Sequence, residues 1–286
     1  MNMEKVICII CEKSNSSPLY KLKDRFGNQC FHLVECSCGF IYLNPRPSCD
    51  QIGDYYTHPS YDPHNENRGI FNYLYSKVRS VVMFYRYVLC RRFVGLQDMN
   101  VLEVGGGKGD FCEYLGLKDV KATCQDPHIT ASDANFNMVS SLDQIKGENI
   151  FNCISMWHSI EHIHDIDKLF INIERLAMKD AILFIAIPNK SSIDRHVFRE
   201  KWVAWDAPRH LYHFSYSDLS KLLSRKGWQI YSSKNLYHDL FYNVLLSLRG
   251  KKHKYLQFAI ILLFMVPISI INNNYSSSRL YICQRK

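Results

Sequence analysis

The stretch NVLEVGGGKGDF, residues 100–111, decides the predicted fold. Its first half alternates apolar residues around one acid, which is typical of a short strand inside a sheet. The glycines that follow must turn the chain sharply into a helix. From there on, strand-like and helix-like segments alternate, which favours a parallel sheet with helices on both faces. We therefore expect an α/β fold over residues 99–286.

The periodicity of apolar residues predicts the individual elements of this sheet. Short β-rich runs bounded by turn residues predict strands, and a 3.6-residue spacing predicts helices. The expected strands cover residues 101–104, 120–125, 150–156, 181–187, 228–233 and 280–284, and the expected helices cover 111–117 and 167–178.

The glycine turn is the first candidate binding site. Gly105, Gly107 and Gly109 alternate, so the backbone there can adopt positive φ and approach a bound group closely. Glu103 lies two residues before the first glycine, at the strand end that opens into the crevice of a parallel sheet. Asp126 follows the next predicted strand, where a carboxylate can accept both hydroxyl protons of an adenosine ribose.

The surroundings of the turn restrict the class of cofactor. The spacing E-x-G-x-G-x-G departs from the dinucleotide pattern G-x-G-x-x-G. Asp110 and Glu113 open the following helix, and negative side chains at a helix start repel a pyrophosphate but tolerate a sulfonium or ammonium cation. The pattern thus favours an adenosine cofactor without phosphate.

At this point the chain resembles the class I S-adenosylmethionine-dependent methyltransferases. The resemblance rests on EVGGGKG (103–109), Asp126, FNCISMWHSIEH (151–162) and AILFIAIPN (181–189). It implies a Rossmann-like sheet and S-adenosylmethionine as cofactor. The wider layout, with NPRP (44–47) and WDAPRHLYHFS (205–215), is similar to bacterial methyltransferases from sugar and surface-polysaccharide pathways.

The resemblance also implies roles for individual residues. Glu103 would position the methionyl amino group, Asp126 would hold the ribose, and Trp157 and His158 would lie beside the methyl donor. The implied cofactor-binding residues are Glu103, Gly105, Gly107, Gly109, Asp126, Asp143 and Trp157.

An oxygen acceptor would benefit from a general base, and histidine is suited to this because its usual pKa is about 6.5. The candidates are His158, His162 and His210, although a structural role is an alternative for each. His158, Glu161 and His162 also raise the possibility of a divalent metal. His158 stands where the related metal-binding pattern has an acid, so we do not expect a metal there.

The segment WVAWDAPRHLYHF (202–214) lies where this fold places substrate-recognition insertions, and we assign the insertion to residues 190–215. Trp205 and Arg209 are the candidate substrate-binding residues, because a guanidinium fork suits a phosphate or carboxylate such as that of a nucleotide sugar. The equal alternative is an Asp206–Arg209 pair that fixes the loop.

Residues 1–48 form a predicted cysteine-rich, zinc-ribbon-like module. The C-x2-C pair Cys8 and Cys11 and the C-x-C pair Cys36 and Cys38 supply four thiolates for one structural Zn²⁺. The shortened second pair leaves Cys30 and His32 as alternative fourth ligands, and buried reduced cysteines are the simpler interpretation.

Residues 49–98 predict a helical aromatic linker or lid, with a helix over 70–93. Residues 236–271 predict a pair of apolar helices. The run FAIILLFMVPI (258–268) is shorter than the roughly 20 residues of a transmembrane helix. Packing in the core or in an oligomer is slightly favoured over contact with an anionic membrane surface.

The overall composition sets further expectations. The chain has 286 residues and a net charge of +8, and its only dense cationic group is Lys251, Lys252 and Lys254. We therefore expect no nucleic-acid partner. The start of the chain lacks the apolar core of a signal peptide, which indicates a cytoplasmic protein, with membrane association as an option.

Taken together, the sequence predicts methyl transfer from S-adenosylmethionine to a small-molecule acceptor, a sugar or a nucleotide-linked sugar of surface glycan synthesis. A lipid or quinone acceptor at the membrane is the enzymatic alternative. The non-enzymatic alternative is a catalytically inactive subunit that binds S-adenosylmethionine.

Overall fold

The computed structural model describes residues 2–56, 70–95, 98–128 and 136–286, and the side chains of the first long helix from Arg79 onward. The chain divides into two compact units. Unit 1 comprises residues 1–58, 161–164 and 186–281, and unit 2 comprises residues 59–160, 165–185 and 282–286. Each unit is described by itself.

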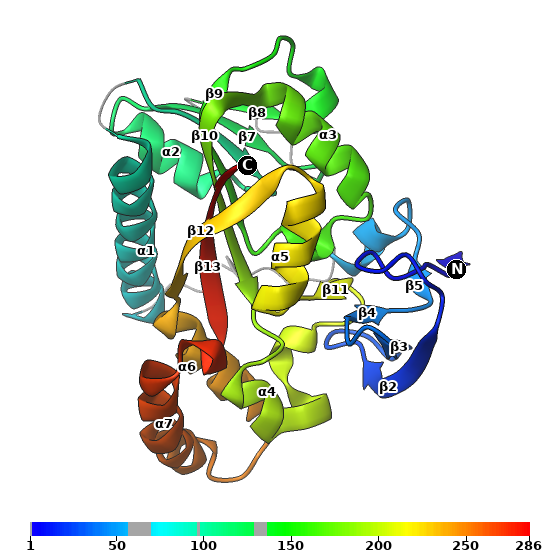
Figure 1. Cartoon of the computed structure of the whole chain (residues 1–286). Helices are drawn as coiled ribbons and strands as arrows, with labels where there is room; N and C mark the ends of the chain where they lie inside the picture. Colours follow the sequence, from blue (N-terminus) through cyan, green and yellow to red (C-terminus); the bar gives the residue numbers. More distant parts are fainter. Residues whose placement is uncertain (1, 57–69, 96–97, 129–135) are drawn as a thin grey trace. The chain divides into compact units, whose positions relative to one another are not determined.

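The secondary structure alternates between strands and helices along most of the chain (Figure 1). The strands are β1 (Met3–Glu4), β2 (Ser16–Lys23), β3 (Cys30–Cys36), β4 (Ile41–Leu43), β5 (Arg46–Pro47), β6 (Asn100–Val104), β7 (Lys121–Gln125), β8 (Asn137–Val139), β9 (Phe151–Trp157), β10 (Ala177–Pro188), β11 (Tyr212–His213), β12 (Trp228–Asn235) and β13 (Ser278–Arg285). The helices are α1 (Ile70–Val94), α2 (Asp110–Gly116), α3 (Ile166–Leu176), α4 (Ile193–Phe198), α5 (Tyr216–Arg225), α6 (Tyr237–Ser247) and α7 (Lys254–Ile271). Short 3-10 helices are η1 (Ile52–Tyr55), η2 (Leu142–Gln144), η3 (Ile160–His162), η4 (Arg199–Lys201), η5 (Val203–Trp205) and η6 (Asn273–Tyr275).

A seven-stranded sheet carries the fold, in the order β12-β13-β10-β9-β6-β7-β8. β6 pairs in parallel with β7 and with β9, and β7 pairs in parallel with β8. Val101 and Leu102 of β6 are fully buried, because a strand in the middle of such a sheet is covered on both faces. The α/β, Rossmann-like prediction is confirmed.

Most of the predicted elements of this sheet are present, with small differences at their ends. The predicted helix 167–178 is α3, which ends two residues earlier, at Leu176. Ala177 already has extended backbone geometry and begins β10. β8 was not predicted, because three residues are too few for an alternating pattern to stand out.

A second sheet lies in unit 1, in the order β11-β4-β3-β2. Its strands are antiparallel, and the edge strand β11 comes from the predicted insertion 190–215, with Tyr212 paired to Tyr42 and His213 paired to Ile41. The aromatic rings of Phe40, Tyr42, Tyr212 and Phe214 pack together in the core of this unit. The insertion therefore completes the sheet of the N-terminal module, a pairing that the sequence did not predict.

The predicted linker 49–98 is described only in part. Its helix is α1, as predicted, but residues 57–69 and the side chains of the first turns of α1 lie outside the described residues. The proposed lid role of the aromatic residues in that part remains a prediction.

The predicted apolar helical pair is α6 and α7. α7 is longer than expected, and it is the one described helix that is long and apolar enough, by length and composition alone, to cross a membrane. Only 11% of its 18-residue window is buried. Among the described residues, packing in the core thus involves only a small part of α7, and packing in an oligomer and contact with a membrane both stay predictions.

Candidate functional site

The glycine turn follows β6 in unit 2 and takes the conformation that the sequence predicted. The φ angles of Gly105, Gly107 and Gly109 are 71°, 56° and 81°. A Cβ at Gly105 would lie 2.4 Å from the Cβ of Ser159, so this glycine is required by packing within the chain. A Cβ at Gly107 would meet nothing within 4 Å. Gly107 is therefore the glycine that leaves backbone open to a ligand.

Asp126 lies against this open part of the turn. The backbone N–H of Gly107 donates to Oδ2 of Asp126 at 2.9 Å, and the N–H of His128 donates to Oδ1 at 3.0 Å. These two bonds fix the carboxylate at the end of β7, next to the turn that follows β6. The structure thus brings together the predicted ribose acid and the glycine loop, and ribose binding remains a prediction.

Glu103 is buried beneath the turn. Oε2 accepts a hydrogen bond from the thiol of Cys112 at 3.4 Å, and Oε1 lies 3.9 Å from the guanidinium of Arg86 on α1. Burial raises the pKa of Glu103 to about 7, against the opposing effects of Arg86 and Cys112. A cation bound at the turn would give the buried Glu103 carboxylate an oppositely charged partner.

Trp157 ends β9 and is also buried. Its ring meets Phe111 edge to face at 6.2 Å, and the Arg86 guanidinium lies 4.6 Å from its centre. Its buried indole Nε1 has no hydrogen-bond partner among the described residues. A buried donor of this kind is an attractive contact for a bound ligand.

His158 follows with a φ of 54°, which is unusual for a residue with a side chain. The next residue fixes this turn, because the Ser159 hydroxyl donates to the carbonyl oxygen of Val104 at 2.7 Å. Strain of this type is concentrated at functional sites. The role of His158 beside a methyl donor stays a prediction.

Asp143 lies on the exposed η2 turn after β8. Its carboxylate pairs with Lys168 at 2.7 Å and accepts a hydrogen bond from the Asn172 side chain at 3.0 Å. These contacts hold the turn to α3 and lower the pKa of Asp143, chiefly through the Lys168 hydrogen bond. Contact between Asp143 and an adenine ring remains a prediction.

The residues of unit 2 fit the expected cofactor. An open backbone at Gly107, an orphaned buried donor on Trp157 and two acids at neighbouring strand ends suit an adenosine group that carries a cation. Acids in this position disfavour phosphate. Glu103 and Asp126 would receive the ammonium and the ribose, respectively.

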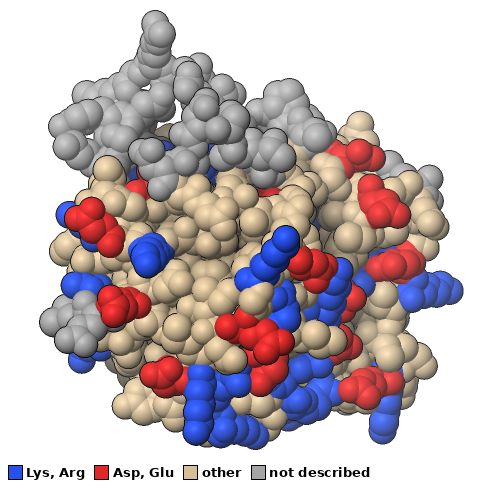
Figure 2. All heavy atoms as spheres, turned by 90° about the horizontal axis from the view of Figure 1, so that it is seen from above, with Lys and Arg blue, Asp and Glu red and all other residues tan. Residues whose placement is uncertain are grey.

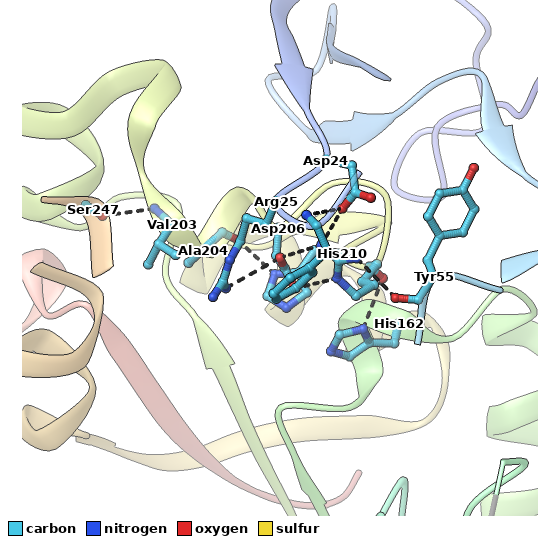
Figure 3. A network of polar contacts seen from close by, with 11 residues as sticks. Asp24, Arg25, Tyr55, His162, Val203, Ala204, Asp206, His210 and Ser247 are labelled. Carbon is cyan, nitrogen blue, oxygen red and sulfur yellow. Dashed lines mark hydrogen bonds and ion pairs between the residues drawn. The ribbon is translucent and has the colours of Figure 1, made fainter. Parts of the chain in front are cut away.

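A second cluster of predicted residues lies in unit 1 (Figure 3). The rings of His162 and His210 meet edge to face, with centres 4.6 Å apart. Nδ1 of His162 lies 3.0 Å from the carbonyl oxygen of Arg209, and Nδ1 of His210 lies 2.8 Å from that of Ala204. Because a carbonyl oxygen only accepts, the contact with Ala204 assigns the ring proton of His210 to Nδ1 and its lone pair to Nε2. Nδ1 of His162 can donate to the Arg209 carbonyl oxygen in the same way.

The two histidines differ as proton acceptors. Burial, followed by the charge of His210, lowers the pKa of His162 to about 4. A base with so low a pKa is a poor proton acceptor near neutral pH. Of this pair, His210 is therefore the stronger candidate for a general base.

The structure groups Glu161, His162 and His210 as possible metal ligands, with ligand atoms within 4.8 Å of one another. The sequence had suggested His158 in place of His210. The sequence placed Tyr56 only within an aromatic-rich stretch, whereas the structure places its hydroxyl 2.9 Å from Nδ1 of His162. Only tertiary contact reveals this neighbour, because Tyr56 belongs to a segment without a motif.

The prediction that Arg209 binds substrate is wrong. Its side chain is 0% exposed. The guanidinium donates to Asp206 at 2.9 and 3.0 Å, to Asp24 at 2.9 Å and to the carbonyl oxygen of Tyr55 at 3.2 Å. The alternative interpretation holds, in which an Asp206–Arg209 pair fixes the loop, and Asp24 adds a second carboxylate (Figure 3).

Trp205 is buried to 1% exposure, and its indole N–H donates to the carbonyl oxygen of Arg199 at 2.8 Å. It nevertheless lines a cavity of about 640 Å³ in unit 1. Six cationic side chains surround this cavity, and two acids accompany them. The cations are Lys21, Lys23, Arg25, Lys201, Arg249 and Lys251, and the acids are Glu200 and Asp206.

The four predicted zinc ligands meet in unit 1. Sγ of Cys8 lies 3.6 Å from Sγ of Cys38, and Sγ of Cys11 lies 3.4 Å from Sγ of Cys36. All four sulfur atoms lie within 4.8 Å of one another. Both knuckles have tight turns, since the N–H of Ile10 donates to Sγ of Cys8 and Gly39 has a φ of 84°. Cys30 and His32 are not part of this cluster.

We predict that Arg209→Met lowers the free energy of unfolding by about 3 to 5 kcal/mol, because the carboxylates of Asp24 and Asp206 stay buried without their cation. Arg25→Met is the matched control. Its guanidinium lies 3.6 Å from Asp206 but is partly exposed, so its loss should cost less than about 1 kcal/mol. Urea unfolding measures both. Equal stability of Arg209→Met and wild type would show that the buried contacts have no such role.

We predict that Glu103 makes stability depend on pH. In the folded chain its pKa is about 7, against 4.5 as the ordinary value, so the stability contributed by the protonated acid is lost as pH rises between these values. Glu103→Gln removes this dependence. Relative to wild type, the variant should gain about 1 to 3 kcal/mol between pH 5 and pH 8. Thermal unfolding without ligand measures this, and Glu113→Gln, on an exposed position of α2, should show no such gain.

Several solved structures are similar to this chain in fold. Among solved structures, a 1,6-didemethyltoxoflavin-N1-methyltransferase from Burkholderia thailandensis is 13% identical, with a TM-score of 0.50, and the match covers 94% of this chain and 99% of that one. A SAM-dependent methyltransferase from Archaeoglobus fulgidus is 17% identical, with a TM-score of 0.45 and coverage of 76% and 100%. A cyclopropane synthase from Mycobacterium tuberculosis is 11% identical, with a TM-score of 0.46 and coverage of 70% and 83%.

The family comparison is more direct. No curated protein sequence matched the chain. A family model described as a methyltransferase domain matches residues 84–233, which is more than half of the chain and includes the glycine turn, Asp126 and the β9 segment. This chain therefore belongs to the methyltransferase-domain family.

Proposed function

We propose that this protein transfers the methyl group of S-adenosylmethionine to a small-molecule acceptor, a sugar or a nucleotide-linked sugar. The observation that carries the proposal is the open turn at Gly107, with Asp126 bonded to it and Glu103 buried beneath it. Family membership supports the reaction class. The choice of acceptor is supported by the cationic cavity in unit 1.

The cofactor supplies a methyl group that is already activated on a sulfonium. The chain has to bind and orient the reactants, because alignment provides much of the rate in such a transfer. Glu103 and Asp126 would hold the two ends of the cofactor. With an oxygen acceptor, Nε2 of His210 would take the hydroxyl proton as the oxygen gains the methyl group.

The cavity in unit 1 fits a small anionic molecule. Its volume of about 640 Å³ is within the usual range for ligand pockets. Lys21, Lys23, Arg25 and Arg249 on its walls suit phosphates. These features support a diphosphate-linked acceptor. We therefore assign phosphate binding to these more exposed cations and not to Arg209.

The face shown in Figure 2 carries both basic and acidic side chains. On the described part of that face, basic and acidic side chains are interspersed. This arrangement is a poor match to a continuous nucleic-acid backbone. It supports a small acceptor.

A lipid or quinone acceptor is the second candidate, and one observation favours it. α7 exposes a long apolar surface, which is described below. A cofactor-binding subunit without catalysis is the non-enzymatic alternative. It would bind S-adenosylmethionine but methylate nothing.

The test is incubation of the purified chain with methyl-labelled S-adenosylmethionine and a cell extract, followed by mass identification of the labelled product. A labelled anionic sugar derivative supports the proposal. A product that partitions into organic solvent supports the lipid acceptor. Cofactor binding without any labelled product supports the inactive subunit.

We predict that His210→Ala lowers turnover by about 100-fold or more while cofactor affinity stays unchanged, because the base acts on the acceptor. The labelled-methyl assay measures turnover, and calorimetric titration measures affinity. His238→Ala, which changes an exposed histidine of α6, is the control and should keep wild-type turnover. Wild-type turnover in His210→Ala would exclude the role of His210 as the base.

We also propose that Cys8, Cys11, Cys36 and Cys38 hold one structural Zn²⁺. Four sulfur atoms on two tight turns suit a closed tetrahedral site, and a small module gains folding free energy from its metal. The expected localisation is the cytoplasm, where thiols stay reduced.

We predict about one zinc atom per chain in elemental analysis of the purified protein, and its loss in Cys8→Ser and Cys36→Ser. These variants should also unfold more readily, because the module loses its metal. Cys30→Ser and Cys49→Ser, which change exposed cysteines, are the matched controls and should keep the metal. Full zinc content in Cys8→Ser would rule out this ligand set.

A further inference from the structure

α7 is apolar on its outer face as well as on its inner face. Met265 and Ser269 are buried at 2% and 1% exposure, and Met265 packs with Leu240 and Val244 of α6. The opposite side of α7 is open to the outside. It consists of Leu256, Ile260, Leu263, Phe264, Ile270 and Ile271, with exposures from 49% to 84%. A helix on a water-exposed surface normally has polar residues on this side.

This outer face is large and continuous. Its residues recur at helical spacing from Leu256 to Ile271 of α7, which corresponds to a length of about 24 Å. α6 exposes two aromatic side chains of its own, Phe241 and Tyr242, which are 45% and 58% exposed. An exposed apolar surface of this extent marks a site of interaction with a protein or a membrane.

The two ends of the helical pair show that α7 does not cross a bilayer. The pair leaves the main sheet after β12 and returns to it at β13, and these strands are neighbours. The N–H of Leu236 donates to the carbonyl oxygen of Ser278 at 3.1 Å, which joins the two ends directly. α6 and α7 lie beside one another (Figure 1). Because the pair starts and ends at the same place, a span along α7 would need a second span along α6, and the 11 residues of α6 are fewer than the roughly 20 that a span needs.

Along the sequence of the pair, the charges are all of one sign after Asp239. From Leu240 to Lys286 the sequence has no Asp or Glu. Arg249, Lys251, Lys252 and Lys254 lie in the turn between the helices and at the start of α7. Cations beside an apolar helix face are complementary to anionic lipid headgroups.

We propose that the outer face of α7, together with Phe241 and Tyr242 of α6, binds one leaflet of an anionic phospholipid membrane. α7 lies parallel to the membrane plane, with its outer apolar residues at the boundary between headgroups and acyl chains. Arg249, Lys251, Lys252 and Lys254 contact the phosphates. Tyr242 and Tyr255, both exposed, suit the interfacial layer.

A second copy of the chain is a weaker match as occupant. It would bring the same cation-rich segment, in which Asp239 at the start of α6 is the one acid, so that most of the lysines would find no complementary carboxylate on the partner helices. An anionic leaflet satisfies both the apolar face and the cations. The inference concerns where the protein binds and does not depend on the acceptor.

The test is flotation of the full chain with phosphatidylcholine vesicles, with and without phosphatidylglycerol. We expect the wild type to float with the anionic vesicles and to be released by high salt. Leu263→Glu with Phe264→Glu should abolish flotation. Lys251→Glu with Lys252→Glu should weaken binding by about tenfold or more.

Matched controls carry the same changes elsewhere. Ile171→Glu places a charge at an apolar position of α3 that is 69% exposed, and Lys118→Glu with Lys121→Glu reverses two exposed lysines of unit 2. Both should float like the wild type. The changed side chains are exposed, so every variant should still fold. Thermal unfolding of each variant checks this.

Two outcomes would overturn the proposal. In the first, the wild type stays with the soluble fraction on anionic vesicles. In the second, sedimentation shows a wild-type dimer that Leu263→Glu with Phe264→Glu converts to a monomer, while neither binds vesicles, and a second copy is then the occupant. Cofactor binding by calorimetry is a separate readout, so failure of the membrane proposal leaves the methyl-transfer proposal testable.

Discussion

A buried guanidinium holds unit 1 together. Arg209 contacts Asp24 from the turn after β2, Tyr55 from η1 and Asp206 from the insertion. Three segments far apart in the sequence therefore meet at one cation. Burying a charge is costly unless its partners are buried with it, so the arrangement is stable only as a complete set. The same contacts place the carbonyl oxygen of Arg209 beside His162, and Asp206 beside the cationic cavity.

Unit 2 depends on a different constraint, the lack of side chains in the turn after β6. Gly105 has no room for a Cβ, and Gly107 has room but a positive φ. The first lets the turn pack on Ser159, and the second leaves the backbone open above the two acids. Glu103 and Asp126 then lie at adjacent strand ends because β6 and β7 are parallel and in register. The two carboxylates attract a cationic adenosine cofactor, and for the same reason they repel a pyrophosphate.

The two candidate surfaces of unit 1 share one segment of chain. Arg249 and Lys251 line the cavity, and the same turn leads into α7 with its exposed apolar face. Cations in this turn are thus available both to a phosphate in the cavity and to headgroups beside α7. If both proposals hold, the protein receives an anionic acceptor close to the surface of a membrane.

Local pattern was sufficient for the sheet, the glycine turn and the paired cysteines, because strand periodicity, glycine spacing and Cys-x-Cys turns are properties of neighbouring residues. The closeness of Glu103 and Asp126 also followed, since parallel strands place their ends together. The partners of Arg209, the closeness of His162 to His210 and the contact with Tyr56 did not follow. They join residues separated by dozens of positions, and burial of the guanidinium cannot be read from its neighbours in the chain. The same holds for α7: the sequence determined that it is apolar, but only the tertiary structure decided that α6 covers one side of it and leaves the other exposed.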